Sequence, residues 1–481
     1  MKKEFMALVG GAILAGITGC ATKSGAAVDT AAYISDAKII VSPYDWGPAV
    51  DKIVLSMSSE ISAAYVERLE NPSVTTNGAA REVSSISLAT EDGETIRGKK
   101  NAKSRFVLVS LKTTFANSGS PFVYDFQKTF QNDWVKSYPV SVRFADGTGF
   151  EADRIDSRIC KATAVFSAQK EISGTYENPM TKATDTITLR YKAYEPESLK
   201  NDGKKNPLVI WLHGQGEGGK DVDVAILGNK VSALAAPKIQ SYFSTEGGAS
   251  GAYVLVPQCE TYWMDGGDGT NSAGDLVSRY TKALYDLISA YVAQNGDIDE
   301  NRIYLGGCSN GGYMTMNMLV EYPDYFAAAY PNCEAYAFNE YARDENGKYI
   351  FEEKGLKLTG ERFMTDEKIE SIKHIPIWFV HSADDTVVAP AGYSIPTYRA
   401  LLDAGAENVH YSYFENVHGV DDPETQFWGH WVWVYLFNDQ VTAVQETGNL
   451  VPSNNGGGTL KARDSKGEYN SIFAWLNAQV K

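Results

Sequence analysis

The feature that most constrains the fold is an alternation of apolar strand-like runs with helical segments, which begins near residue 166 and continues to the C-terminus. The strand-like runs include residues 208–212, 302–305 and 376–380, and a helical pattern covers residues 272–293. Continuous apolar strands between helices are typical of a mostly parallel sheet with helices on both faces. The sequence therefore predicts an α/β domain over residues 166–481, with its chemistry at the carboxyl ends of the strands.

Residues 34–165 follow a different pattern. Short runs with period-two alternation, such as residues 38–42, 52–56 and 105–111, are separated by clusters of Gly, Asn and Asp. Several short strands without a long helical stretch indicate an all-β sandwich. This part of the sequence contains no catalytic motif.

The first residues indicate export. Two lysines precede an apolar run over residues 5–17, which is too short to cross a membrane as a mature helix. The four residues that end in Cys20 resemble the lipobox of bacterial lipoproteins, which implies cleavage before Cys20 and its lipidation. Residues 1–19 are then a signal peptide, and residues 20–33 are the lipidated cysteine and a small-residue tether. We expect a lipoprotein of the cell envelope, at the outer membrane or the cell surface; an ordinary signal peptide with a chance cysteine is the alternative.

The net charge argues against a nucleic-acid partner, and the spacing of the histidines argues against a metal cofactor. The formal net charge is −16, and a strongly acidic surface repels phosphate backbones, so no nucleic acid is expected. The six histidines do not cluster at ligand spacing, so we expect no catalytic metal and no other cofactor.

Four cysteines follow Cys20, and their wide spacing excludes a zinc site of the CxxC type. Cys308 and Cys333 would follow neighbouring strands, so they are the best candidates for a disulfide in an exported chain. Free buried thiols are the equal alternative.

The central motif is the G-x-S-x-G sequence of residues 307–311. A strand leads into it and a helix leads out, which is the context of a nucleophile elbow. In such an elbow a strained turn holds the Ser309 hydroxyl above the sheet, and the helix N-terminus faces the developing negative charge. A glycine-rich turn with an ordinary serine is the alternative, and the flanking elements argue against it.

An acyl-transfer site also needs two backbone N–H donors for the oxyanion. We assign them to Asn310, directly after the nucleophile, and to Gln215, in the glycine-rich loop after the strand at residues 208–212. The loop lacks the G-x-x-x-x-G-K-[ST] pattern and carries Glu217, so it is not a phosphate cradle.

A serine hydroxyl needs a base and a group that orients the base, and in this fold they follow the serine in the order acid, then histidine. Asp384 and Asp385 compete for the acid. The segment resembles the H-G-x-x-D-x-x-V pattern of many α/β-hydrolases, and matching its His to His381 and its Val to Val388 favours Asp385. His418 and His430 both follow the last strand and are the two candidates for the base.

Together these residues resemble bacterial esterases of the prolyl-oligopeptidase-like α/β-hydrolase group that carry an N-terminal immunoglobulin-like domain (EstA-like esterases). The specific likeness lies in residues 299–336. The resemblance implies an immunoglobulin-like sandwich at residues 34–165 and a Ser–Asp–His carboxylesterase at residues 166–481. Such esterases place the base in G-H-x-S-W, which favours His430 because Trp433 keeps the spacing, although valine replaces the serine.

We therefore expect a serine carboxylesterase that uses Ser309, Asp385 and His430 and acts on short-chain or aromatic acyl esters. The substrate is a small-molecule or polysaccharide-linked ester, and a lipid at Cys20 provides the membrane contact. A serine peptidase with the same machinery and an inactive binding lipoprotein are the alternatives.

Three segments have open roles. Residues 262–265 would either wall the pocket or form a packed loop, and Glu334 would either contact substrate or brace the site. Residues 439–469 look like an insertion before the last helix.

Overall fold

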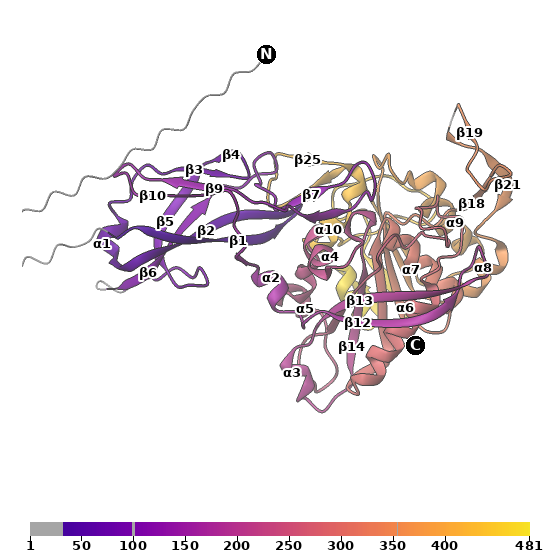
Figure 1. Ribbon diagram of the computed structural model, residues 1–481. Helices are drawn as coiled ribbons and strands as arrows, with labels where there is room; N and C mark the ends of the chain where they lie inside the picture. Colours follow the sequence, from indigo (N-terminus) through magenta and orange to yellow (C-terminus); the bar gives the residue numbers. More distant parts are fainter. Residues whose placement is uncertain (1–31, 99–101, 354) are drawn as a thin grey trace, which may run out of the picture.

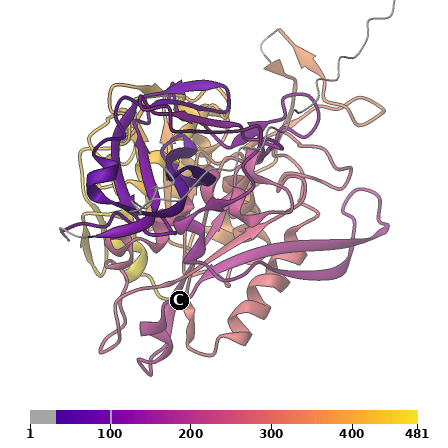
Figure 2. The same cartoon turned by 60° about the vertical axis from the view of Figure 1, so that its left-hand side comes forward.

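The computed structural model describes residues 32–98, 102–353 and 355–481 (Figure 1). The expected signal peptide and Cys20 lie outside the described residues. An all-β region and a larger α/β region lie side by side in Figure 1, and in Figure 2 the all-β region comes forward and overlaps the α/β region. None of the helices in these three ranges is long and apolar enough to cross a membrane.

The N-terminal region consists of two sheets with one core between them. Side chains from both sheets meet in this core, including Val107 and Val109 of one sheet and Val140 and Val142 of the other. Alternate residues point inward, as period-two patterning requires. The five-stranded sheet has the order β11-β1-β2-β6-β5, and the four-stranded sheet the order β10-β9-β3-β4. The predicted all-β sandwich is confirmed.

The elements of this region are β1 (Ile34–Tyr44), β2 (Gly47–Ser62), α1 (Ala63–Val66), β3 (Ser73–Thr76), β4 (Ala79–Arg81), β5 (Val83–Ala89), β6 (Lys103–Leu111), β9 (Val140–Arg143), β10 (Gly149–Ala152), β11 (Arg158–Ile159) and α2 (Lys161–Ala164). A separate hairpin is formed by β7 (Phe122–Tyr124) and β8 (Asn132–Trp134).

The C-terminal region is built on one eight-stranded sheet with the order β12-β13-β15-β14-β16-β17-β22-β23. From β15 onward the neighbouring strands are parallel, whereas β12 and β13 are antiparallel additions at one edge. The strands are β12 (Lys170–Glu177), β13 (Thr184–Tyr194), β14 (Asn206–Leu212), β15 (Tyr253–Gln258), β16 (Ile298–Cys308), β17 (Ala328–Asn332), β22 (Ile377–Ser382) and β23 (Val409–Phe414). The predicted mostly parallel sheet is confirmed.

Both faces of this sheet are covered. On β14, Leu208, Ile210 and Leu212 belong to the core on one face, and Val209 and Trp211 belong to the core on the other. Burial on both sides explains why the strand reads as one continuous apolar run in the sequence. The first face is covered by α6 (Thr281–Gln294), α7 (Asn310–Glu321), α8 (Asp366–Ile372) and α9 (Ser394–Asp403). The second is covered by α4 (Val222–Gly228), α5 (Pro237–Gln240), α10 (Trp433–Phe437) and α11 (Ile472–Ala478).

The helix expected over residues 272–293 begins only at Thr281, so the first part of that prediction is wrong. Gly274 has a φ of +89°, and a side chain there would collide with the carbonyl of Ala335. The buried Asp275 carboxylate accepts hydrogen bonds from the Tyr341 N–H and the Arg343 guanidinium. These contacts hold the segment as a loop, although its apolar spacing suits a helix.

The remaining elements are short. They are α3 (Glu197–Lys200), the single-turn helices η1 (Gln215–Glu217), η2 (Val231–Ala235), η3 (Pro390–Gly392) and η4 (Gly429–Trp431), and the hairpin strands β18 (Asn339–Tyr341), β19 (Phe351–Glu352), β20 (Gly355–Leu356), β21 (Leu358–Arg362), β24 (Val417–His418), β25 (Gln426–Phe427), β26 (Ala462–Asp464) and β27 (Gly467–Tyr469). Figure 1 shows β18 to β21 as a projecting arm.

The segment expected as an insertion, residues 439–469, lies along the free edge of β23. The N–H of Gln445 donates to the carbonyl of Tyr411 at 2.8 Å, and the N–H of Tyr413 donates to the carbonyl of Gly457 at 2.7 Å. An uncovered strand edge is prone to pair with other chains, so this segment protects the edge.

A buried ion-pair network joins the two regions. Asp45, in the turn between β1 and β2, accepts from Lys230 Nζ at 2.8 Å and from Asn438 Nδ2 at 2.8 Å. Its other oxygen accepts from the backbone N–H groups of Val420 and Asp421, and its side chain has no exposed surface. Burial alone would raise the pKa of Asp45, but Lys230 and the hydrogen bonds outweigh it and lower the pKa. The network therefore fixes the β1–β2 turn against the segment that precedes η4.

Candidate active site

Ser309 stands at the sharp turn between β16 and α7. Its backbone has a φ of +56° and a ψ of −114°, an unfavourable conformation for a residue with a side chain. A side chain at Gly307 would lie 2.6 Å from the carbonyl of Leu212, and one at Gly311 would collide with the same carbonyl. Only glycine fits at both positions, because the turn packs directly on the end of β14. This is the geometry of a nucleophile elbow.

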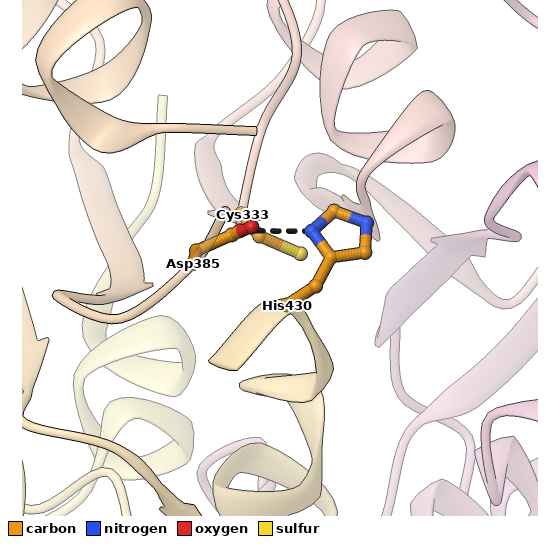
Figure 3. A group of neighbouring side chains, drawn as sticks. All are labelled: Cys333, Asp385 and His430. Atoms are coloured by element: carbon orange, nitrogen blue, oxygen red, sulfur yellow. Dashed lines mark hydrogen bonds and ion pairs between the residues drawn. The ribbon is translucent and has the colours of Figure 1, made fainter. Parts of the chain in front are cut away.

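Asp385 and His430 meet at the carboxyl ends of the strands. Figure 3 shows the His430 ring directed at the Asp385 carboxylate, with 2.8 Å between Nδ1 and Oδ2. The other carboxylate oxygen accepts from the N–H groups of Val387 and Val388 at 2.8 and 2.9 Å. His381 Nε2 lies 3.2 Å from Oδ2. Hydrogen bonds at both oxygens therefore fix the Asp385 carboxylate, and the carboxylate in turn orients the His430 ring.

Electrostatics favour a charged Asp385. Burial alone would raise the pKa of this carboxyl, but the hydrogen bonds and charges of His381 and His430 outweigh it and hold the pKa well below its usual range. The group thus remains an acceptor for the ring N–H at Nδ1, which leaves Nε2 of His430 as the nitrogen that can take a proton.

The competing residues lie elsewhere. Asp384 accepts from the Ser382 hydroxyl at 2.6 Å and from Gln426 Nε2 at 3.3 Å, so it braces the loop. His418 pairs with Gln426 across β24 and β25, and its N–H donates to the Tyr435 hydroxyl. Within the three described ranges, His430 is the histidine that the structure brings to the Asp385 carboxylate at the cavity.

Cys333 lies beside this pair (Figure 3), and the Cys333 thiol, an Asp385 oxygen and a His430 nitrogen all lie within 4.8 Å of one another. Burial raises the pKa of the thiol well above its usual value, so it is a neutral packing group beside a ring nitrogen already hydrogen-bonded to Asp385. The four cysteines of the described ranges are all free. The Cys308–Cys333 disulfide is therefore absent, and the alternative of buried free thiols holds.

Asn310 and Gln215, the two expected oxyanion donors, are tied together through one side chain. Asn310 Nδ2 donates to Asn271 Oδ1 at 2.7 Å, and Asn271 Nδ2 donates to Gln215 Oε1 at 2.9 Å. Asn310 Oδ1 also accepts from the N–H of Met264 at 3.0 Å. Sequence reasoning missed Asn271, because it borders the segment expected to be helical. The glycines at 266, 267 and 269 were a signal for a loop there.

Glu217 follows in the same loop and is 6% exposed. Burial raises the pKa of its carboxyl to about 7. Asn132, on β8 of the N-terminal region, lies 3.4 Å from it through Nδ2, and Gln258 Nε2 donates to its backbone carbonyl at 2.8 Å. The loop is thereby supported from both regions of the molecule.

A cavity of about 420 Å³ opens above Ser309 and His430 and reaches the loop that contains Gln215. This volume is in the range of ordinary small-molecule pockets. Much of its wall is aromatic: the lining residues include Trp46, Tyr124, Phe126, Trp428, Trp431 and Trp433.

Residues 262–265 and Glu334 are not among the described residues that line this cavity. The Tyr262 hydroxyl donates to the Thr129 carbonyl at 2.6 Å, and Trp263 is fully buried. Glu334 is buried and accepts from the N–H of Tyr336 at 2.7 Å. Residues 262–265 thus form a packed loop, and Glu334 braces the turn that follows Cys333.

The strand order, the covering helices and the elbow define an α/β hydrolase preceded by an immunoglobulin-like sandwich, so the expected fold class is confirmed. Comparisons with known proteins agree. Residues 281–442 match the prolyl oligopeptidase family, residues 196–333 match the phospholipase/carboxylesterase family, and residues 36–148 match the esterase Ig-like N-terminal domain. The resemblance to esterases of this architecture is confirmed, and the matched families support a hydrolase.

Two individual proteins illustrate the likeness. A solved structure described as a thermostable esterase has 24% identity and a TM-score of 0.60, and the likeness covers 85% of this chain and 97% of that one. Poly(3-hydroxyalkanoate) depolymerase C of Paucimonas lemoignei is 32% identical over 133 residues, which are 26% of this chain and 27% of that protein. The chain thus matches about a quarter of its curated relative, and the solved structure supports the fold.

Proposed function

We propose that the protein is a serine carboxylesterase that works through an acyl-enzyme. The observation that carries this proposal is the contact of 2.8 Å between His430 Nδ1 and Asp385, in a cavity whose lining also includes Ser309. Ser309 acts as the nucleophile, His430 as the base and Asp385 as the acid that orients the base. No cofactor takes part in the reaction.

The reaction has two halves. His430 Nε2 takes the proton of Ser309 as the hydroxyl attacks the ester carbonyl, and Asp385 stabilises the imidazolium that forms. The backbone N–H groups of Asn310 and Gln215 bind the oxyanion. His430 then protonates the departing alcohol. Water next attacks the acyl carbonyl while His430 takes its proton, and His430 returns a proton to the Ser309 oxygen as the carboxylic acid leaves.

An ester is a better substrate class than a peptide. The match over residues 36–148 is to a domain of esterases, and the curated relative is named as a depolymerase of a polyester. The match over residues 281–442 is to a family named for a peptidase and supports the competing function. The acyl group is short or aromatic, and the alcohol is a small molecule or a polysaccharide.

Hydrolysis of p-nitrophenyl acetate, butyrate and octanoate tests the proposal in the native chain, Ser309→Ala, His430→Ala and His418→Ala. We expect Ser309→Ala and His430→Ala each to lose at least about 10³-fold in kcat, while His418→Ala stays close to the native chain. Loss in His418→Ala with retention in His430→Ala would reverse the choice of base. Cleavage of a blocked dipeptide p-nitroanilide in preference to the esters would identify a peptidase, and a folded chain inert on all of them would favour a binding role.

We also propose that the chain is an exported lipoprotein anchored through Cys20, on the strength of its first residues. Incorporation of radiolabelled palmitate into the native chain and its loss in Cys20→Ser is the expected result. Equal labelling of both chains, or labelling of neither, would contradict it.

A further inference from the structure

Two large aromatic side chains are exposed at the cavity. Phe126 is 74% exposed and Trp428 is 68% exposed, and both line the same cavity as Ser309. A single exposed aromatic is common on protein surfaces, but two at one cavity, contributed by different regions, call for a ligand-based explanation.

Phe126 is presented by a firmly anchored hairpin. Trp134 Nε1, on β8, donates to Asp221 Oδ2 at 2.8 Å, and Gln131 Nε2 donates to the Thr261 carbonyl at 2.7 Å. The Asp125 carboxylate accepts from the N–H groups of residues 127 and 128 and so shapes the turn that follows β7. The Phe126 ring packs against Tyr124 with 4.6 Å between centroids. The hairpin base is fixed to the hydrolase region, and the ring remains exposed to solvent.

Trp428 begins a row of indole rings that leads to the base. The centroids of Trp428 and Trp431 are 5.8 Å apart, those of Trp431 and Trp433 are 6.4 Å apart, and Trp433 meets the His430 ring edge-on at 5.9 Å. Exposure falls from 68% at Trp428 to 8% at Trp433, so the row runs from the rim to the floor of the cavity. Figure 1 shows both β25, which immediately precedes Trp428, and β7 at the junction of the two regions.

The charged groups of the lining do not offset this aromatic character. Asp45 and Glu217 both line the cavity, but each is buried; Asp45 is paired with Lys230, and burial raises the pKa of Glu217. The wall therefore suits a flat apolar group, since aromatic rings gain from stacked and edge-on contacts beyond the area they bury.

We propose that this cavity binds the aromatic acyl group of an ester, with Phe126 and Trp428 as the specificity-determining residues. The inference rests on the proposed esterase function and names its substrate class: esters of aryl or arylalkenoyl acids. The acyl side is chosen because the acyl group stays attached to Ser309 until water releases it. The alcohol departs in the first half-reaction, so firm retention of its ring would oppose release.

The test compares ethyl cinnamate with ethyl butyrate, which share the same leaving alcohol, and adds 2-phenylethyl acetate, whose ring is on the alcohol. The measurement is kcat/KM for the native chain, Phe126→Ala and Trp428→Ala. We expect the native chain to prefer the cinnamate, and each variant to lose about tenfold on the cinnamate with little change on the butyrate. The conservative variants Phe126→Tyr and Trp428→Tyr keep a ring and should keep most of the preference.

Phe351→Ala is the matched control, because Phe351 is 73% exposed on β19 and is not a lining residue of the cavity. It should leave all three rates unchanged. Equal losses on cinnamate and butyrate, no loss in either alanine variant, or a loss confined to 2-phenylethyl acetate would each overturn the inference while the esterase function stands. A native chain that hydrolyses none of the three esters would instead remove the proposed function itself.

Discussion

The two regions of the molecule contribute to one cavity in different ways. The hydrolase region contributes Ser309, Asp385 and His430 from turns at the ends of its strands, whereas the sandwich region contributes aromatic surface through Trp46, Tyr124 and Phe126. The positions of these proposed reactive groups depend on local backbone geometry, which short motifs encode. The shape of the cavity depends on contacts between the regions, and no motif records them. A change at Ser309, Asp385 or His430 should therefore abolish the chemistry, whereas a change in the aromatic wall, to which both regions contribute, should alter the selectivity.

The largest loss of activity should come from a change of Asp385, the proposed acid in the hydrolase region. We expect Asp385→Asn to lower kcat by about 10⁴-fold, because an amide at this position favours the wrong tautomer of the His430 ring. KM should change little, because the cavity wall is untouched. Steady-state kinetics on p-nitrophenyl butyrate measure both parameters.

Asp384→Asn is the matched control, since it changes the neighbouring carboxyl, which contacts Ser382 and Gln426 rather than His430. It should keep kcat within a few-fold of the native chain. Comparable losses in the two variants would mean that the loop as a whole, rather than the contact between Asp385 and His430, sets the rate.

The same contrast explains what the sequence could predict. Ser309 was identifiable because the strand, the two glycines and the helix that create its turn are adjacent in the chain. Asp385 was favoured by spacing alone, and the choice between His430 and His418 depended on a tryptophan three residues away. Phe126 carried no signal, because its importance comes from a cavity shared with Trp428 in the other region. Asn271 was missed because apolar periodicity predicted a helix directly after it, where Gly274 and Asp275 hold a loop.

The second prediction concerns stability and the ion-pair network around Asp45 that joins the two regions. Asp45→Ala removes one of the two carboxylates that contact Lys230 Nζ and leaves a cavity, while Asp421 still contacts Lys230 at 2.8 Å. The expected cost is therefore about 3 kcal/mol, the lower end of the range for removing one partner of a buried pair. The free energy of unfolding, measured by urea denaturation with tryptophan fluorescence, should fall by about this amount. Activity should fall as well, since Asp45 fixes residues 420 and 421 ahead of η4.

Glu91→Ala removes an exposed ion pair with Lys38 in the same sandwich and should change little, because exposed pairs contribute weakly to stability. Asp45→Asn keeps the side-chain oxygen and separates the loss of charge from the loss of hydrogen bonds. If Asp45→Ala unfolds at the same urea concentration as Glu91→Ala, the network does not hold the regions together.

The smallest expected effect concerns Glu217, which lies in the same loop as Gln215 and contacts Asn132 of the sandwich region. Burial raises the pKa of Glu217 from 4.5 to about 7, so between these values the folded chain holds a proton that the unfolded chain releases. Its contribution to the free energy of unfolding is complete below pH 4.5 and declines as the pH rises to about 7, at about 1.4 kcal/mol per unit. Glu217→Gln keeps an uncharged side chain at every pH and should remove this decline. Urea midpoints at about pH 5 and about pH 8 measure it, and the difference between the two chains cancels the other titrating groups. The variant should therefore gain on the native chain at the higher pH, because only the native chain must then bury a charge beside Asn132. Parallel pH dependence in both chains would show that this carboxyl is ionised in the fold. The sandwich region would then contribute wall surface to the cavity without stabilising a neutral carboxyl in its lining.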